Sequence, residues 1–205
     1  MKDGSDLLRT KATSEPDDSD APDHLGGGRK RGHIDPGAYR FLRERFTINS
    51  MLDIGCGLGC MVEYARNDGI VARGVDGDTY GKPDILWDFT HGPCPSLDDV
   101  DLVWSMEFLE HVDEKLLHNY MPAFQMGKVV MATFAPPGKA GHHHVNCQDQ
   151  PYWEDVFAQC GFKFERDLTA GLRKASRMES VLWDGRLRDS SFKRFVTDHG
   201  MVFTR

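Results

Sequence analysis

Short apolar runs alternate with amphipathic stretches along most of the chain, and this alternation predicts strands that take turns with helices. The predicted strands cover residues 51–54, 69–76, 85–89, 100–104, 128–134, 162–165 and 200–205. Helical patterns cover residues 36–46, 61–67 and 151–160, and in the first of these Tyr39 and Leu42 share one apolar face. Strands that alternate with helices predict an α/β domain with a central, mostly parallel sheet flanked by helices.

Two stretches depart from this pattern. Residues 1–32 are rich in Asp, Pro and Gly and contain few large apolar side chains, so we expect a disordered acidic tail ahead of a domain over residues 33–205. Residues 168–199 are basic with interleaved apolar positions. Two interpretations of this second stretch stay open: a lid or acceptor-recognition insert, and an ordinary solvated helix pair.

Composition narrows the class of protein. The chain has 205 residues, 40% of them hydrophobic, and a formal net charge of −7, so we expect a real core and no global attraction to nucleic acid. No apolar run approaches the ~18 residues that span a bilayer, so no membrane partner is expected, and the polar, acidic first residues lead us to expect no signal peptide. The five cysteines form no C-x-x-C pair, which favours reduced thiols and a cytoplasmic location.

Candidate chemistry begins directly after the first core strand, where Gly55, Gly57 and Gly59 precede a helix. A strand, a glycine turn and a helix together bind nucleotide-like ligands, because glycine lets the backbone approach and the helix N-terminus offers unpaired N–H groups. Asp53 precedes the turn; its carboxylate would repel a pyrophosphate but suits an ammonium group. At the end of the next strand, Asp76 is placed to accept hydrogen bonds from ribose hydroxyls, unless it is an ordinary strand-end residue.

The segment from Asp53 to Gly59, D-I-G-C-G-L-G, closely resembles the first motif of the class I S-adenosylmethionine (SAM) methyltransferases. The resemblance implies a Rossmann-like fold with a seven-stranded sheet whose last strand is antiparallel, and SAM as the cofactor. It also implies that Asp88 accepts from the adenine amino group, although Asp88 could equally cap the turn that follows it. The expected cofactor-binding residues are Asp53, Gly55, Cys56, Gly57, Gly59, Asp76, Gly77, Asp88, Phe89, Ser105 and Met106.

The fourth predicted strand leads into a segment with two carboxylates and an imidazole. If a helix begins near Met106, then Glu107, Glu110 and His111 share one face and could hold a divalent cation such as Mg²⁺ or Zn²⁺. The segment resembles the E-x-x-E-H segment of the ubiquinone-pathway O-methyltransferases and the small-RNA 2′-O-methyltransferases, which implies a cation near the acceptor hydroxyl. In the alternative, Glu107 lines the cleft while Glu110 and His111 only begin the helix.

A Gly- and Pro-rich loop after the fifth strand carries His142, His143 and His144. His144 could complete the metal site, or one of the three could act as a general base, because imidazole titrates near neutrality. The candidate catalytic residues are His111, His143, His144 and Glu107, and the candidate metal ligands are Glu107, Glu110, His111 and His144. The alternative is a polar loop with incidental histidines.

These features predict a SAM-dependent methyltransferase that methylates a hydroxyl oxygen of a small molecule or glycan. No N-P-P-Y segment, typical of enzymes that methylate amide or base nitrogen, is present, and the acidic body argues against a large RNA footprint. Four other functions stay open: 2′-O-methylation of RNA, a SAM-dependent enzyme of a different reaction, a nicotinamide-dependent oxidoreductase on the same sheet, and a non-catalytic nucleotide-binding module. The sequence predicts no oligomeric state.

Overall fold

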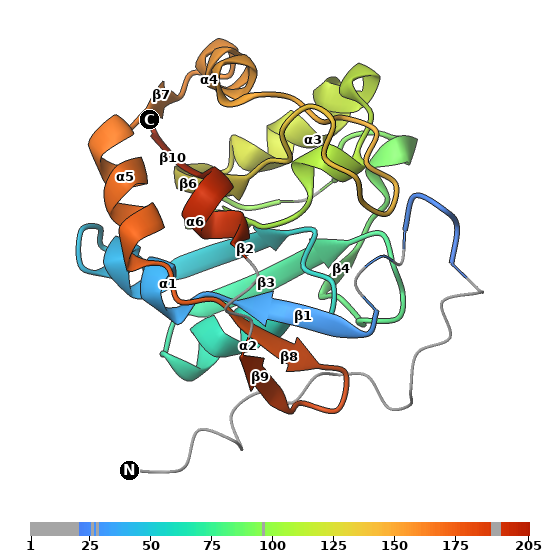
Figure 1. Ribbon diagram of the computed structural model, residues 1–205, viewed down its shortest axis with the longest axis horizontal. Helices are drawn as coiled ribbons and strands as arrows, with labels where there is room; N and C mark the ends of the chain where they lie inside the picture. Colours follow the sequence, from blue (N-terminus) through green and yellow to red (C-terminus); the bar gives the residue numbers. More distant parts are fainter. Residues whose placement is uncertain (1–20, 26, 28, 96, 190–193) are drawn as a thin grey trace.

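The computed structural model describes residues 21–25, 27, 29–95, 97–189 and 194–205, so most of the expected acidic tail lies outside the described residues. Its main sheet has seven strands in the order β4-β3-β2-β5-β6-β10-β7 (Figure 1). They are β2 (Ser50–Ile54), β3 (Val71–Asp76), β4 (Ile85–Leu86), β5 (Val100–Ser105), β6 (Gly127–Thr133), β7 (Lys163–Phe164) and β10 (Gly200–Thr204). Strand β10 is antiparallel to both of its neighbours, and the other strands run parallel, which confirms the predicted fold class.

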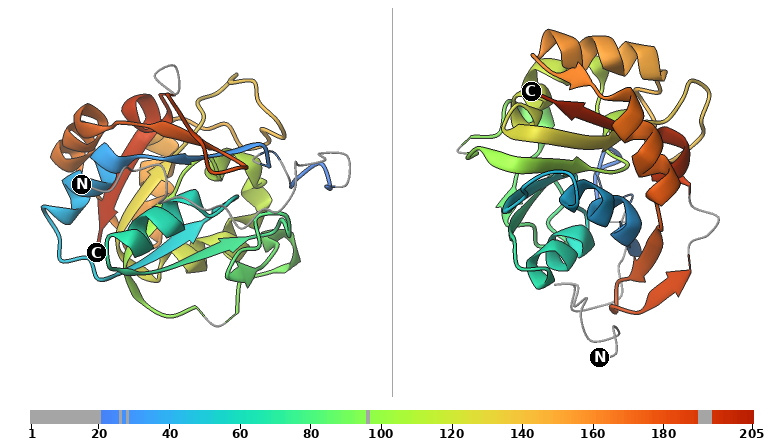
Figure 2. Two further views of the ribbon diagram at one scale, coloured as in Figure 1. Left: turned by 90° about the horizontal axis from the view of Figure 1, so that it is seen from below. Right: turned by 90° about the vertical axis from the view of Figure 1, so that its left-hand side faces the viewer.

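Helices cover both faces of this sheet (Figure 2). They are α1 (Pro36–Arg43), α2 (Cys60–Asn67), α3 (Leu117–Phe124), α4 (Gln150–Gln159), α5 (Arg166–Ala175) and α6 (Phe195–His199). Met51 of β2 packs in the core that α1, α2, α5 and α6 share, whereas Leu52 and Ile54 pack in the core with α3 and α4. Because successive residues of a strand face opposite sides, a short apolar strand supplies both cores. Among the described residues, no helix combines the length and apolarity that a bilayer crossing requires.

A second, three-stranded antiparallel sheet lies beside the main one (Figure 1). It consists of β1 (Arg31–Ile34), β8 (Glu179–Leu182) and β9 (Leu187–Asp189) in the order β1-β8-β9. Strand β1 spans the boundary that we expected between residues 32 and 33. The hairpin of β8 and β9 shows that residues 168–199 are not a plain helix pair. Helices α5 and α6 are present, but β8 lies between them in the sequence and pairs with β1, with Ile34 opposite Glu179.

The third predicted strand is shorter than expected. Strand β4 ends at Leu86, and Phe89–His91 form a single 3-10 turn, η3. The cause is Asp88, whose carboxylate accepts from the backbone N–H of Thr90 at 2.8 Å and so caps the turn. Side chains of this type compete with sheet hydrogen bonding by bonding to their own backbone, which ends the strand here.

Candidate active site

A cleft of about 960 Å³ opens where β2, β3 and β5 end. In parallel α/β sheets, ligands bind at the carboxyl ends of the strands. The volume lies near the upper end of the ~300–1,000 Å³ that ligand sites occupy. Seven of the nine histidines line this cleft: His24, His33, His111, His142, His143, His144 and His199.

The glycine turn after β2 forms one wall. Gly55, Gly57 and Gly59 have φ angles of +73°, +51° and +72°, which glycine adopts without steric cost. A Cβ added at Gly55 would lie 2.7 Å from the Phe108 ring, whereas a Cβ at Gly57 would meet nothing within 4 Å. Gly57 lines the cleft, so this backbone is open to a ligand.

Asp76, at the end of β3, links the glycine turn after β2 to the turn that directly follows β3. One carboxylate oxygen accepts from the N–H of Gly57 at 2.8 Å, and the other accepts from the N–H of Asp78 at 2.8 Å. Burial raises the pKa of the Asp76 carboxyl, and these backbone hydrogen bonds oppose the rise. Asp76 therefore lies in the cleft wall with an anchored carboxyl group.

Asp53 lies on the same wall and is only 4% exposed. Its burial, and next the charge of Asp76, raise the pKa of Asp53 to about 8. In the described part of the chain no Lys or Arg forms a salt bridge with it. Without a ligand, Asp53 is thus mostly neutral at pH 7, and a bound cation would favour its ionised form.

The structure brings most of the expected cofactor residues into this cleft. The ones that line it are Asp53, Gly55, Cys56, Gly57, Asp76, Gly77, Asp88, Phe89 and Met106. Gly59 and Ser105 do not line it. Gly59 is the N-cap of α2, and the buried Ser105 hydroxyl donates to the carbonyl of Ile54 at 3.0 Å.

The expected helix from Met106 is wrong. Strand β5 ends at Ser105, and Glu107 takes a φ of +58°, with its N–H donating to Thr133 Oγ1 at 2.8 Å. The 3-10 turn η4 (Leu109–His111) begins only after this kink, so Glu107 shares no helical face with Glu110 and His111. A left-handed non-glycine residue costs roughly 1–3 kcal/mol, and such strain concentrates at functional sites.

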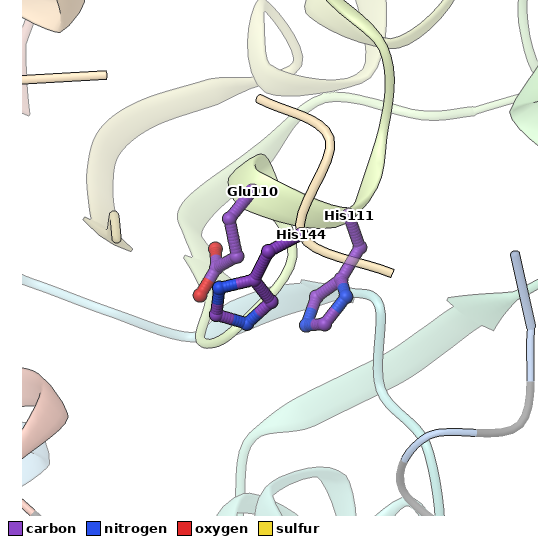
Figure 3. A group of neighbouring side chains, drawn as sticks. All are labelled: Glu110, His111 and His144. Atoms are coloured by element: carbon purple, nitrogen blue, oxygen red, sulfur yellow. The ribbon is translucent and has the colours of Figure 1, made fainter. Parts of the chain in front are cut away.

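Three of the four candidate metal ligands nevertheless meet. Glu110, His111 and His144 each offer a ligand atom, and these atoms lie within 4.8 Å of one another (Figure 3). The N–H groups of Val145 and Asn146 donate to the Glu110 carbonyl at 2.9 and 3.1 Å, which joins the histidine loop to η4. Glu107 lines the same cleft outside this group.

Burial shifts the protonation of two members of this cluster. It raises the pKa of the Glu110 carboxyl to about 7. In the described part of the chain, neither buried carboxylate oxygen of Glu110 has a hydrogen-bond partner. Burial, and next the nearby His144, lower the pKa of His111 to about 4, so its ring is neutral at pH 7. His144 Nδ1 lies 3.0 Å from the Lys139 carbonyl; the tautomer that donates this bond leaves Nε2 with a free lone pair.

Three residues of the site escaped the sequence analysis. Asn146 is 2% exposed and anchors the histidine loop by donating to the Val112 carbonyl at 3.2 Å. Arg29 forms a buried ion pair with Asp78, two residues after Asp76. The available signals were the basic run of residues 29–31, which begins with Arg29, and the second acid of residues 76–78, but neither indicates its partner.

No protein-family model and no curated protein sequence matches the chain. Solved structures do match it. A TehB-like SAM-dependent methyltransferase from Corynebacterium glutamicum aligns with a TM-score of 0.53 and 18% identity, over 82% of this chain and 87% of that one. The methyltransferase domain of bacterial CtHen1-CN gives 0.53 and 12%, over 82% and 96%. The magnesium protoporphyrin IX methyltransferase of Synechocystis with bound SAH gives 0.52 and 12%, over 82% and 80%. The chain therefore has the fold of the class I SAM-dependent methyltransferases.

Proposed function

We propose that the chain is a SAM-dependent methyltransferase that methylates a hydroxyl oxygen of a small molecule or glycan. One observation carries the proposal: a single cleft is lined by two sets of groups, Asp53, the open glycine turn and Asp76 in one, and Glu110, His111 and His144 in the other. The first set, which we call the cofactor end, has the groups that a cationic nucleoside cofactor needs. The second set, which we call the acceptor end, has groups that assist removal of a hydroxyl proton.

Each group at the cofactor end has a proposed contact with SAM. Asp53 would pair with the ammonium group of SAM, the backbone at Gly55 and Gly57 would cradle its amino-acid end, and Asp76 would accept from the ribose hydroxyls. Asp88 and Phe89 line the cleft beyond Asp76 and would contact the adenine. When bound, SAM supplies a methyl group that is already electrophilic, so the chain must mainly orient the acceptor and exclude water.

An oxygen acceptor also has to lose its proton. A base with a pKa of about 4 is weak at pH 7, which makes His111 better suited to hold a metal than to take this proton. His143 and His144 line the cleft and remain the candidate bases; a metal held by His144 would leave His143 as the base.

The cluster at the acceptor end fits a divalent metal. Glu110 contributes a buried carboxylate with no hydrogen-bond partner in the described chain, and His111 and His144 contribute imidazole nitrogens. One carboxylate with two imidazoles favours Zn²⁺ or a related transition metal over Mg²⁺, which prefers oxygen ligands. Such an ion would lower the pKa of a hydroxyl bound to it.

Loss of a ligand is expected to remove the metal. Glu110→Gln and His144→Ala should each lower Zn²⁺ affinity by at least about tenfold, because each removes one of three protein ligands. Metal content after dialysis against limiting Zn²⁺ measures this by elemental analysis. His143→Ala is the matched control, since His143 lines the same cleft outside the cluster. Equal metal content in all the variants would contradict the assignment.

Calorimetric titration tests the function. The purified chain should bind SAM and its product, and not NAD; binding of NAD alone would indicate an oxidoreductase instead. An acceptor screen with methyl-labelled SAM, run with and without chelator, then identifies the substrate class. Binding of SAM without turnover of any acceptor would favour a non-catalytic module.

One observation favours 2′-O-methylation of RNA as a second candidate. His144 follows β6 and meets Glu110 and His111, two residues of the segment that resembles the E-x-x-E-H segment of the small-RNA enzymes. The net charge of −7 counts against a large nucleic-acid footprint, so short RNA oligonucleotides belong in the screen as a minority class.

Binding of SAM should release a proton. Because burial raises the pKa of Asp53 to about 8, the ligand-free carboxyl is protonated at pH 7, and pairing with an ammonium group would ionise it. Close to one proton per SAM is expected at pH 7, falling towards zero above pH 9. Calorimetry in buffers of different ionisation enthalpy measures it, and Asp53→Asn should abolish it. The same shift means that the contribution of Asp53 to the stability of the ligand-free protein falls as the pH rises from about 4 to 8, since the folded-state carboxyl then keeps a proton that the unfolded-state carboxyl has lost.

A further inference from the structure

Three residues near the start of the described chain, His24, Leu25 and Arg29, line the cleft, and we name them the strap residues. Arg29 is 9% exposed, and its guanidinium donates to both carboxylate oxygens of Asp78, at 2.7 and 2.9 Å. It also lies over the Tyr80 ring, 5.5 Å from the centroid. A buried, two-pronged pair of this kind is among the stronger polar contacts in proteins.

The Arg29 pair fixes the turn after β3. Asp78 accepts from the N–H of Tyr80 at 3.0 Å, and its own N–H donates to Asp76 at 2.8 Å. Asp76 in turn accepts from Gly57 in the glycine turn. Arg29 therefore acts through Asp78 on the carboxylate that faces the cleft.

His24 makes a different kind of contact. Its Nε2 lies 2.9 Å from Asp88 Oδ2, and the other oxygen of Asp88 accepts from the N–H of Thr90 at 2.8 Å. The His24 side chain is 32% exposed, and its ring is 6.3 Å from that of His143. Both oxygens of Asp88 are thus engaged, and a ligand that donates to Asp88 has to compete with His24.

Leu25 packs against the segment between Asp76 and Asp78. A Cβ added at Gly77 would lie 2.7 Å from Leu25 Cδ2, so the leucine packs directly on the residue that follows Asp76. The cleft still measures about 960 Å³ with the strap residues in its wall. The strap residues therefore cover the cleft without filling it.

We propose that the strap residues form an added wall of the cofactor site with two opposed effects: Arg29 positions Asp76 for the cofactor, and His24 competes with the cofactor for Asp88. The inference rests on the proposed function, which places the nucleoside of SAM at Asp76 and Asp88. Arg29 is a positioning residue, because it touches Asp78 rather than the ligand. When SAM binds, Arg29 keeps its contact with Asp78, whereas His24 is displaced from Asp88.

Calorimetric titration of SAM into the full chain and three variants tests this. Arg29→Ala is expected to weaken SAM binding by about tenfold or more, and Arg29→Lys, which keeps the charge but loses the fork, should fall between it and the parent. His24→Ala is expected to tighten binding by about two- to tenfold, the size of one competing hydrogen bond. A purely structural role of the segment would not make a deletion of side-chain contacts improve affinity. Arg31→Ala is the control, since Arg31 lines the cleft and is exposed.

A second measurement needs no cofactor. In the ligand-free protein, the amide hydrogens of Asp78 and Tyr80 should exchange faster in Arg29→Ala than in the parent and in Arg31→Ala, because their acceptors lose their anchor. Unchanged exchange, unchanged SAM affinity in Arg29→Ala, or unchanged or weaker affinity in His24→Ala would overturn the proposal. If the parent chain binds no SAM while exchange responds as expected, the proposed function fails, and the positioning of Asp76 by Arg29 stands.

Discussion

Asp76→Ala is expected to weaken SAM binding by at least about 100-fold, the largest loss from any single change in the cleft. The substitution removes the acceptor for the proposed ribose hydroxyls and also the two backbone contacts, to Gly57 and Asp78, that hold the walls together. Hydrogen bonds to a charged group contribute about 1.5–3 kcal/mol each, and tenfold in affinity is about 1.4 kcal/mol. Losing both hydroxyl contacts is therefore sufficient for this effect.

Calorimetry with SAM measures the loss of affinity, and two further variants show whether the loss comes from the ligand contacts or from the fold. Asp76→Asn keeps the shape and one carbonyl oxygen, so it should lie between the parent and Asp76→Ala. Asp84→Ala is the matched control: Asp84 also accepts from a backbone N–H, that of Gly74 at 2.9 Å, but lies outside the cleft. Comparable losses in Asp76→Ala and Asp84→Ala would mean that the effect is on the fold and not on the ligand.

The cofactor end could be predicted from sequence because each of its signals is local. The strand, the three glycines and the helix follow one another from Ser50 to Asn67, and positive φ at Gly55, Gly57 and Gly59 is what glycine in a tight turn indicates. The β-α-β order then places Asp76 beside the turn, since parallel neighbours β2 and β3 end at the same edge. The residues missed at this end, Arg29 and Asp78, are joined by a contact between distant segments that no local pattern encodes.

The acceptor end could be predicted only in part. The sequence indicated that Glu110, His111 and His144 belong together, and the structure places them together by backbone hydrogen bonds from Val145 and Asn146. It did not indicate the kink at Glu107, because the favourable i, i+3 and i+4 spacing of a helix gives no information about the Thr133 hydroxyl that captures the Glu107 N–H. Tertiary contacts overrode a correct local periodicity.

The second sheet was missed for a related reason. Strand β1 and strand β8 pair across nearly the whole length of the chain, Arg31 with Leu182 and Ile34 with Glu179. A four-residue strand with one fully buried position, Ile34, carries little alternation for a sequence pattern to detect. A polar contact at its end holds this strand in place: the Asp35 carboxylate accepts from the Ser176 hydroxyl and from the Arg177 N–H.

Asp35→Ala is expected to lower the free energy of unfolding by about 3–5 kcal/mol, the largest stability effect of any polar substitution that we propose. Asp35 is fully buried between β1 and α1. Oδ1 accepts from the N–H of Ala38 at 2.9 Å, which caps α1, and from the N–H of Arg177 at 2.7 Å; Oδ2 accepts from the Ser176 hydroxyl at 2.5 Å. The substitution leaves these buried donors without their acceptor, and each unsatisfied group costs about 1–3 kcal/mol.

Chemical denaturation followed by circular dichroism measures the loss, and thermal unfolding should shift by roughly 10 °C at about 2–4 °C per kcal/mol for a chain of this size. Ser176→Ala is the matched control; it removes one donor and keeps the carboxylate, so about 1 kcal/mol is expected. A loss in Asp35→Ala no larger than that in Ser176→Ala would contradict the proposed role. Because Asp35 ties the end of β1 to the segment between α5 and β8, its loss should also loosen the three-stranded sheet beside the cleft. Hydrogen exchange of β1 and β8 in Asp35→Ala, compared with exchange in the central strand β5, distinguishes this local loosening from a uniform loss of stability.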